Sequence, residues 1–166
     1  MKVRPISKIY IHCSYSSWGD LNEISSWHKV RNFREVQMSN GETTHCGYHT
    51  IIYNPYTKYD FLKNKKIDSN TDGQIVQARP DGEIGAGVRN DNTFSLHVCY
   101  VGFTPTPMQL MSLTSVCLDW IKLYNIKIDS VLGHYEYYEN AGLPVIKTCP
   151  QIQMDGFRSM LRHYVT

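Results

Sequence analysis

Apolar and polar residues alternate near the start of the chain. In the stretch KIYIHCSY, Ile9 and Ile11 alternate with Tyr10 and His12. Successive side chains of a β-strand face opposite sides of a sheet, so this period of two predicts a first strand.

Other stretches rich in β-branched and aromatic residues predict further strands. They are CGYHTIIY, which runs from Cys46 to Tyr53, and the later stretches QIVQARP and TFSLHVCYVGF. IDSVLGH predicts a short strand that runs into His134.

Helical spacing appears in three segments. In the first, Asp20 and Glu23 resemble a capping box, and the residues of its apolar face are Ile24, Trp27 and His28. The second opens at TPMQ with a hydroxyl cap, a proline and a glutamine, and its buried stripe is Leu110, Leu113, Cys117, Trp120, Ile121 and Tyr124. For the third, the residues expected on one side are Phe157, Met160, Leu161, Tyr164 and Val165.

Strands that alternate with helices predict an α/β fold in which helices cover one central sheet. The chain has 166 residues, which favours a single domain over residues 1–166. Residues 54–69 are rich in lysines and turn formers. We expect a surface insertion there, with a small hairpin as its form.

Composition and charge narrow the classes of protein. Hydrophobic residues make up 42% of the chain and its formal net charge is +2, so we expect no nucleic-acid partner. The five cysteines never form a CxxC pair, which predicts a reducing compartment rather than a disulfide scaffold. The N-terminal stretch lacks a signal-peptide pattern and no apolar run is long enough for a membrane span. We therefore expect a cytoplasmic protein.

Candidate chemistry begins in the stretch VIKTCPQ. Lys147 and Cys149 are two residues apart, and Pro150 favours an extended backbone at Cys149. Both side chains would then share one surface. A neighbouring cation lowers the pKa of a thiol, which would make Cys149 a better nucleophile or a better metal ligand.

A zinc enzyme needs three protein ligands and an open fourth position. His12, His134 and Cys149 are candidates, since each follows or ends a predicted strand, where catalytic groups of α/β sheets collect. Their spacing does not decide the matter. Any one of the seven histidines is more often a surface or core residue, and a lone cysteine is more often a small buried apolar group. Tyr48 and Lys147 also have interpretations that involve no catalysis: Tyr48 as an ordinary aromatic residue of a strand, and Lys147 as a solvated loop charge.

Six blocks occur in order along the chain: IYIHCSYSS, WHKVRNF, CGYHTII, FTPTPMQLMSL, LGHYE and KTCP. Together they resemble the zinc-dependent N-acetylmuramoyl-L-alanine amidases, a family that includes phage endolysins of the lysozyme type and peptidoglycan recognition proteins. The resemblance implies a mixed sheet flanked by helices. It also implies one zinc ion bound by His12, His134 and Cys149, with Tyr48 and Lys147 as the catalytic side chains.

The implied reaction is hydrolysis of the amide that joins N-acetylmuramic acid to the L-alanine of the stem peptide. Zinc would activate water and polarise the carbonyl. Lys147 would stabilise the tetrahedral oxyanion, and Tyr48 would either orient the water or donate a hydrogen bond to the oxyanion. The stretch GEIGAGVRNDN departs from the family pattern, because it lacks the histidine expected between its glycines. No sugar- or peptide-binding residues are assigned.

The leading interpretation is a phage or prophage endolysin, a monomer whose partner is peptidoglycan and which acts on the wall after release. A cytoplasmic amidase that recycles muropeptides is an alternative. A non-catalytic peptidoglycan-binding protein is another, although such relatives usually lack the cysteine ligand. Some phage amidases also inhibit the phage RNA polymerase, but no motif here indicates that activity.

Overall fold

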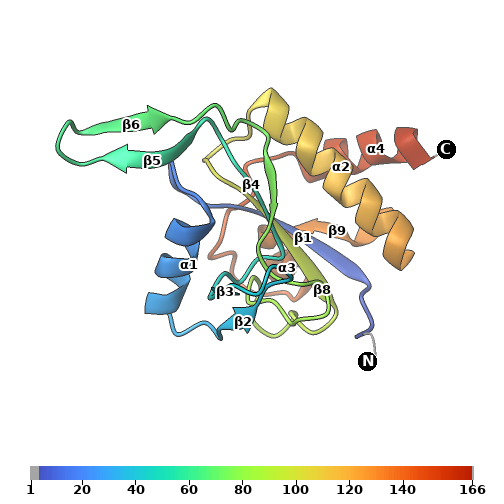
Figure 1. The fold of residues 1–166 in the computed structure, drawn as a ribbon. Coiled ribbons are helices and arrows are strands. Elements are labelled where there is room, and N and C mark those ends of the chain that lie inside the picture. The colour runs from blue at the N-terminus through green and yellow to red at the C-terminus, as the bar shows by residue number, and fades with distance from the viewer. Residues whose placement is uncertain (1–3, 166) are drawn as a thin grey trace.

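The computed structural model describes residues 4–165, and a five-stranded mixed sheet forms their centre (Figure 1). Its strands, in spatial order, are β7 (Ile75–Gln77), β4 (Thr50–Ile52), β8 (Ser95–Tyr100), β1 (Lys8–Cys13) and β9 (Val131–Gly133). β1 pairs in parallel with β8 and β9, and β8 pairs in parallel with β4, whereas β7 is antiparallel to β4. The prediction of an α/β fold with a mixed central sheet is confirmed.

Helices α2 (Pro107–Tyr124) and α4 (Met154–Val165) cover one face of the sheet (Figure 1). Ile9 and Ile11 of β1 belong to the hydrophobic core on this face, together with Leu113 of α2 and Leu161 of α4. A smaller core lies beside α1 (Leu21–Val30). The alternation predicted for the first strand is therefore confirmed, and it leaves His12 on the face opposite to α2.

The predicted helix starts are also confirmed. The Asp20 carboxylate accepts a hydrogen bond from the Glu23 N–H, 2.9 Å away, at the start of α1. Thr106 and Gln109 form a complete capping box at the start of α2. The amide of Gln109 is fully buried and donates to the carbonyls of Ile52 and Val101, which ties this helix to the strands.

The lysine-rich segment forms a projecting antiparallel hairpin, β5 (Tyr56–Asp60) and β6 (Lys65–Asp68) (Figure 1). The Trp18 ring stacks on Tyr59 of β5, near the turn of the hairpin, with 5.6 Å between ring centroids. That this hairpin is an insertion relative to other members of the family stays a prediction. Over residues 4–165, no helix is both long and apolar enough to cross a membrane.

The strand expected from Cys46 to Tyr53 is shorter in the structure, where β4 covers only Thr50–Ile52. Side chains bond the preceding backbone in place of a neighbouring strand: Thr44 Oγ1 accepts from the Cys46 N–H, and His28 Nδ1 accepts from the Gly47 N–H. The chain therefore turns toward α1 before it joins the sheet.

Several short elements were not predicted. They are the paired strands β2 (Val36–Gln37) and β3 (Thr43–Thr44), the 3-10 helix η1 (Ile128–Ser130) and the helix α3 (His134–Asn140). The apolar side predicted for α4 holds at Phe157 and Leu161, which are buried, and is wrong for Tyr164 and Val165, which are mostly exposed. These two residues lie on the last turn of α4, at the end of the described chain (Figure 1).

Candidate metal centre and cleft

Two adjacent parallel strands bring two histidines to one edge of the sheet. His12 is the next-to-last residue of β1, and His134 directly follows β9. Ile11 pairs with Gly133 in the register between these strands. The ends of parallel strands meet at the same edge, so the two imidazoles face each other although they are far apart in sequence.

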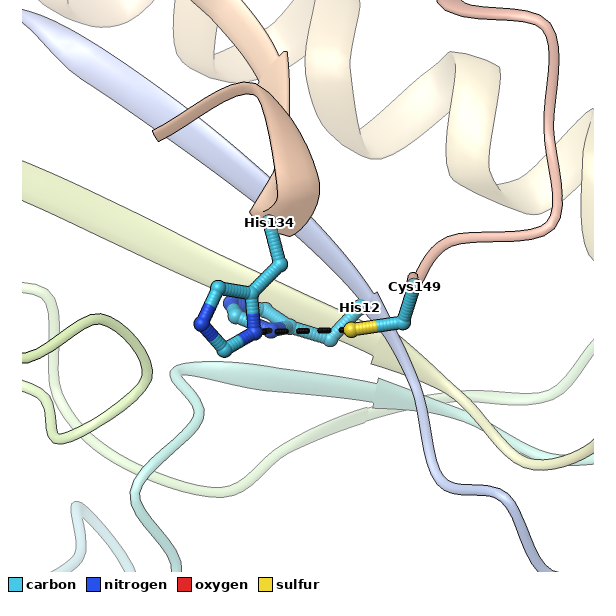
Figure 2. A group of neighbouring side chains, drawn as sticks. All are labelled: His12, His134 and Cys149. Atoms are coloured by element: carbon cyan, nitrogen blue, oxygen red, sulfur yellow. Dashed lines mark hydrogen bonds between the residues drawn. The ribbon is translucent and has the colours of Figure 1, made fainter. Parts of the chain in front are cut away.

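The segment that follows α3 brings Cys149 to the same place (Figure 2). His12 Nδ1 lies 3.2 Å from His134 Nδ1, and His134 Nδ1 lies 3.4 Å from Cys149 Sγ. One ligand atom from each of the three residues falls within 4.8 Å of the others, and all three side chains are buried. The structure thus brings the three predicted zinc ligands together.

Two of the three separations, His12–His134 and His134–Cys149, fit a tetrahedral zinc ion. With zinc–nitrogen bonds of about 2.0–2.1 Å and a zinc–sulfur bond of about 2.3 Å, two nitrogen ligands lie about 3.3 Å apart and a nitrogen and a sulfur about 3.6 Å apart. The two measured contacts agree within a few tenths of an ångström. Two imidazoles and one thiolate also leave a fourth position open, as in catalytic zinc sites.

Burial keeps both histidines of the site neutral. Burial lowers the pKa of His12 well below its ordinary value, and the neighbouring His134 lowers it further. Burial, with a smaller effect of Lys147, lowers the pKa of His134 to about 4. Both imidazoles therefore stay neutral at pH 7 and keep a lone pair for a metal. The hydrogen bond with Cys13, together with burial, raises the pKa of Cys149, and a bound zinc ion would reverse this by deprotonating the thiol.

A cavity of about 600 Å³ opens at two of the three side chains, His134 and Cys149, and His12 lies buried next to them. Tyr48 and Lys147 both line it, together with His134 and Cys149. Lys147 is exposed, so its ammonium can reach a ligand in the cavity. The two predicted catalytic residues therefore lie at the same cleft as the predicted ligands.

Tyr48 lies just before β4 and not within a strand. Its ring packs against both His12 and His28, with centroid distances of 5.0 and 5.1 Å. Burial raises the pKa of Tyr48 well above its ordinary value. Its hydroxyl therefore keeps its proton at neutral pH and can donate a hydrogen bond.

Of the further cleft residues, Arg31 and Arg89 were not predicted as part of the site, and for Tyr138 the sequence left two roles open, lining the cleft or packing. Arg31 and Arg89 line the cavity as exposed cations, and Tyr138 stacks on His134 with 5.8 Å between ring centroids. Arg31 lies in WHKVRNF, one of the six blocks. Its place in that block is the sequence feature that could have identified it as a site residue. Arg89 and Tyr138 lie in stretches whose role the sequence left open.

His97 was also missed, because it appears in the sequence as one more residue of a strand. It is fully buried in β8. Its Nδ1 lies 3.1 Å from His12 Nε2, on the side of the His12 ring away from His134.

Comparisons with known proteins show the family of the chain and the proteins that share its fold. The sequence profile of the family described as N-acetylmuramoyl-L-alanine amidase matches residues 2–152. The chain therefore belongs to the N-acetylmuramoyl-L-alanine amidase family, as the six sequence blocks predicted, and it is a hydrolase of that class. No curated protein matches the chain significantly.

Solved structures share the fold. The N-acetylmuramoyl-L-alanine amidase LysC from Clostridium intestinale URNW superposes with a TM-score of 0.66 at 19% identity, covering 96% of this chain and 86% of LysC. The Ph2119 endolysin from Thermus scotoductus MAT2119 bacteriophage Ph2119 gives 0.57 at 18% identity, covering 95% and 84%. Human PGRP-IBETAC, solved in complex with glycosamyl muramyl pentapeptide, gives 0.58 at 12% identity, covering 90% and 79%.

Proposed function

We propose that this protein hydrolyses the amide bond between N-acetylmuramic acid and the L-alanine of peptidoglycan, with one zinc ion bound by His12, His134 and Cys149. The observation that carries the proposal is the convergence of these three ligand atoms at a site where His134 and Cys149 line an open cleft. Membership of the amidase family supplies the class of bond. The whole chain, residues 1–166, would act as a single amidase domain.

Zinc, when bound, would supply a Lewis acid that polarises the amide carbonyl and activates a water molecule. The protein's own side chains would do the rest. Attack on the amide places negative charge on the carbonyl oxygen, and this charge needs donors fixed in advance. Lys147 would supply a cation at the rim of the cleft. Tyr48, which burial keeps protonated, would donate a hydrogen bond to the same oxygen rather than act as a base.

The charge of the cleft supports a peptidoglycan substrate. Arg31, Arg89 and Lys147 all line the cavity, and peptidoglycan stem peptides carry carboxylates. Guanidinium groups bind carboxylates in a bidentate, planar geometry. The cationic side chains of the cleft would therefore bind the carboxylates of the stem peptide while the amide to be cleaved lies next to the three proposed zinc ligands. The similarity in fold to endolysins supports a role in degrading the cell wall.

The proposal is tested by zinc content and amide cleavage in Cys149→Ser. Replacing the thiolate removes one of three ligands, so we expect loss of bound zinc and of hydrolysis with the fold retained. Cys117→Ala is the matched control, because Cys117 lies on the buried face of α2, in the hydrophobic core. It should keep both zinc and activity.

Wild-type cleavage rates in Cys149→Ser would overturn the metal assignment. Comparing intact walls with small muropeptides then separates an endolysin from a recycling amidase. Binding of muramyl peptides without cleavage by the zinc-loaded wild-type protein would favour a non-catalytic receptor.

A further inference from the structure

His97 lies at the centre of the sheet, on the same face as His12. In the parallel pairing of β8 with β1, His97 is opposite Tyr10, and His12 is opposite Cys99. The His97 ring stacks between the rings of Tyr10 and His49, with centroid distances of 5.8 and 5.7 Å and interplanar angles of 12° and 13°. These two neighbours fix the plane of the imidazole.

The two ring nitrogens of His12 have different partners. Nδ1 faces His134 Nδ1 at 3.2 Å, on the side of the three candidate ligands. Nε2 faces His97 Nδ1 at 3.1 Å. His97 is thus the side chain that meets His12 on the side away from the candidate metal site.

From this arrangement we propose that His97 is a positioning residue, which holds His12 in the tautomer and ring orientation that zinc binding requires. The inference rests on the proposed zinc site. A metal at His12 Nδ1 uses the lone pair of that nitrogen, so the proton of the neutral ring must sit on Nε2. Buried inside the protein, that N–H needs an acceptor, and His97 Nδ1 is the acceptor within reach. Such outer partners fix the orientation of a ligating histidine and raise its basicity.

An unsatisfied atom supports the inference. His97 Nε2 is the buried side-chain nitrogen or oxygen that lacks a hydrogen-bond partner among the described residues. Buried polar groups in native proteins are nearly always paired, so an exception calls for a reason. If His97 Nδ1 accepts from His12, the proton of His97 is forced onto this unpaired Nε2. An apolar side chain at position 97 would avoid the free-energy cost of an unpaired buried N–H. It would, however, leave the His12 N–H without an acceptor.

Two glycines make room for the imidazole. A Cβ atom at Gly87 would lie 2.3 Å from His97 Nδ1 and 2.8 Å from His12 Nε2, and one at Gly85 would lie 2.6 Å from His97 Cδ2. A side chain at position 87 would therefore point into the space that the His97 ring fills. This is the stretch where the family resemblance led us to expect a histidine between the glycines. His97, on strand β8, would supply an imidazole next to Gly85 and Gly87.

The inference is tested by zinc affinity, measured by competition with a chelator. His97→Leu removes the acceptor, and we expect zinc binding to weaken by about 10- to 100-fold. His97→Asn is the matched variant, because its side-chain oxygen falls near the position of Nδ1, and it should bind zinc within a few-fold of the wild type. Thermal unfolding of the zinc-free proteins shows whether either substitution acts through the fold alone.

An exchange of positions gives a second test. His97→Gly should lose affinity as His97→Leu does, and the double variant His97→Gly/Gly87→His should regain most of it. Gain of affinity from a second substitution cannot be explained by loss of packing. Failure of the double variant to improve on His97→Gly, with both folded, would count against the proposal.

Nitrogen NMR of the wild-type imidazoles needs no variant and decides the case if the substitutions prevent folding. With zinc bound, we expect the proton of His12 on Nε2 and that of His97 on Nε2. A proton on His97 Nδ1, or equal zinc affinity in wild type and folded His97→Leu, would overturn the inference and leave the proposed function standing. A wild-type protein that binds no zinc would overturn both.

Discussion

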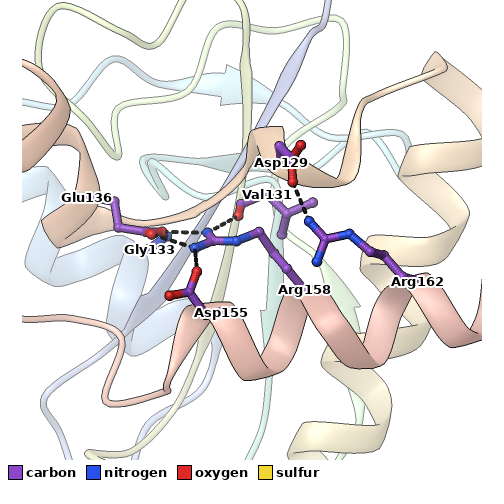
Figure 3. Close-up of polar contacts among 7 residues, drawn as sticks. All are labelled: Asp129, Val131, Gly133, Glu136, Asp155, Arg158 and Arg162. Atoms are coloured by element: carbon purple, nitrogen blue, oxygen red, sulfur yellow. Dashed lines mark hydrogen bonds and ion pairs between the residues drawn. The ribbon is translucent and has the colours of Figure 1, made fainter.

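Arg158 and Glu136 form a bidentate ion pair that joins α4 to the start of α3 (Figure 3). The two nitrogen–oxygen distances are 2.9 and 2.8 Å, and both side chains are about nine-tenths buried. Glu136 Oε2 also accepts from the Gly133 N–H at 2.8 Å, and Arg158 donates to the Val131 carbonyl. Since Gly133 directly precedes His134, this pair fixes the backbone that presents a proposed zinc ligand.

Arg158→Met should therefore destabilise the protein and weaken zinc binding together. Removing one partner leaves the Glu136 carboxylate buried without its counterion, which typically costs about 3–5 kcal/mol. Chemical unfolding of the zinc-free protein measures the loss of stability, and chelator competition measures the loss of affinity.

Arg162→Met is the matched control, one turn further along α4. Arg162 pairs with Asp129, whose side chain is 82% exposed, and exposed pairs contribute about 0.2–1 kcal/mol. Equal losses of stability in the two variants would contradict the role given to the Arg158–Glu136 pair.

Lys147→Met and Tyr48→Phe should reduce kcat by about 100- to 1000-fold each, the usual effect of losing one oxyanion donor. Zinc content should not change, because neither side chain is a proposed ligand. The measurement is steady-state hydrolysis of a muramyl peptide beside metal analysis of the same samples. A fall in zinc content that matches the fall in kcat would instead assign these residues to the metal site.

Arg89→Ala should raise KM for an anionic muramyl peptide by about tenfold, with kcat nearly unchanged. Arg89 lines the cleft as an exposed cation, and a charged hydrogen bond contributes about 1.5–3 kcal/mol when it is made. For a substrate analogue whose peptide carboxylates are amidated, the wild type and Arg89→Ala should have the same KM. An unchanged KM for the anionic substrate would remove Arg89 from the binding surface.

Stability should fall as the pH drops below about 6.5. Burial lowers the pKa of His28 to about 4 and that of His49 to about 3, from an ordinary value of 6.5. At a pH between 6.5 and the folded pKa of each histidine, the unfolded chain therefore binds a proton that the folded protein does not bind. Each histidine contributes stability that is fully present above pH 6.5 and is lost toward its folded pKa, on the order of 1 kcal/mol per pH unit.

Unfolding of the zinc-free protein at several pH values between 7 and 4.5 checks this slope. His28→Asn removes one titrating group and keeps an acceptor for the Gly47 N–H, which His28 Nδ1 accepts at 2.9 Å. Its free energy of unfolding should depend less steeply on pH than that of the wild type. Identical slopes would show that His28 is not held neutral by burial.

Periodicity predicted the parts of the fold in which one face of an element is buried. The alternation of Ile9 and Ile11 with His12 gave the first strand its correct faces, and the stripe on α2 followed helical spacing. The shortened strand β4 and the helix α3 escaped prediction. The side chains of Thr44 and His28 bond the backbone before β4, and α3 is a tyrosine-rich helix of seven residues.

The site was predictable where ordered motifs carried it, and the structure brings His12, His134 and Cys149 together accordingly. His97 escaped because its chemistry depends on a neighbour across the sheet. In the sequence it is one residue of a buried strand, and its contact with His12 spans 85 positions. The cleft cation Arg89 escaped for the same reason, since no periodic pattern marks a residue that only a folded loop brings to a cavity.

Zinc-dependent hydrolysis of the muramoyl–alanine amide can be seen directly by mass spectrometry of purified peptidoglycan after digestion by this protein, with zinc present and again after chelation. We expect free stem peptides that begin at L-alanine in the presence of zinc, their disappearance with the chelator, and their return when zinc is restored. Intact muramoyl–peptide linkages under all three conditions, with the protein folded, would contradict this expectation.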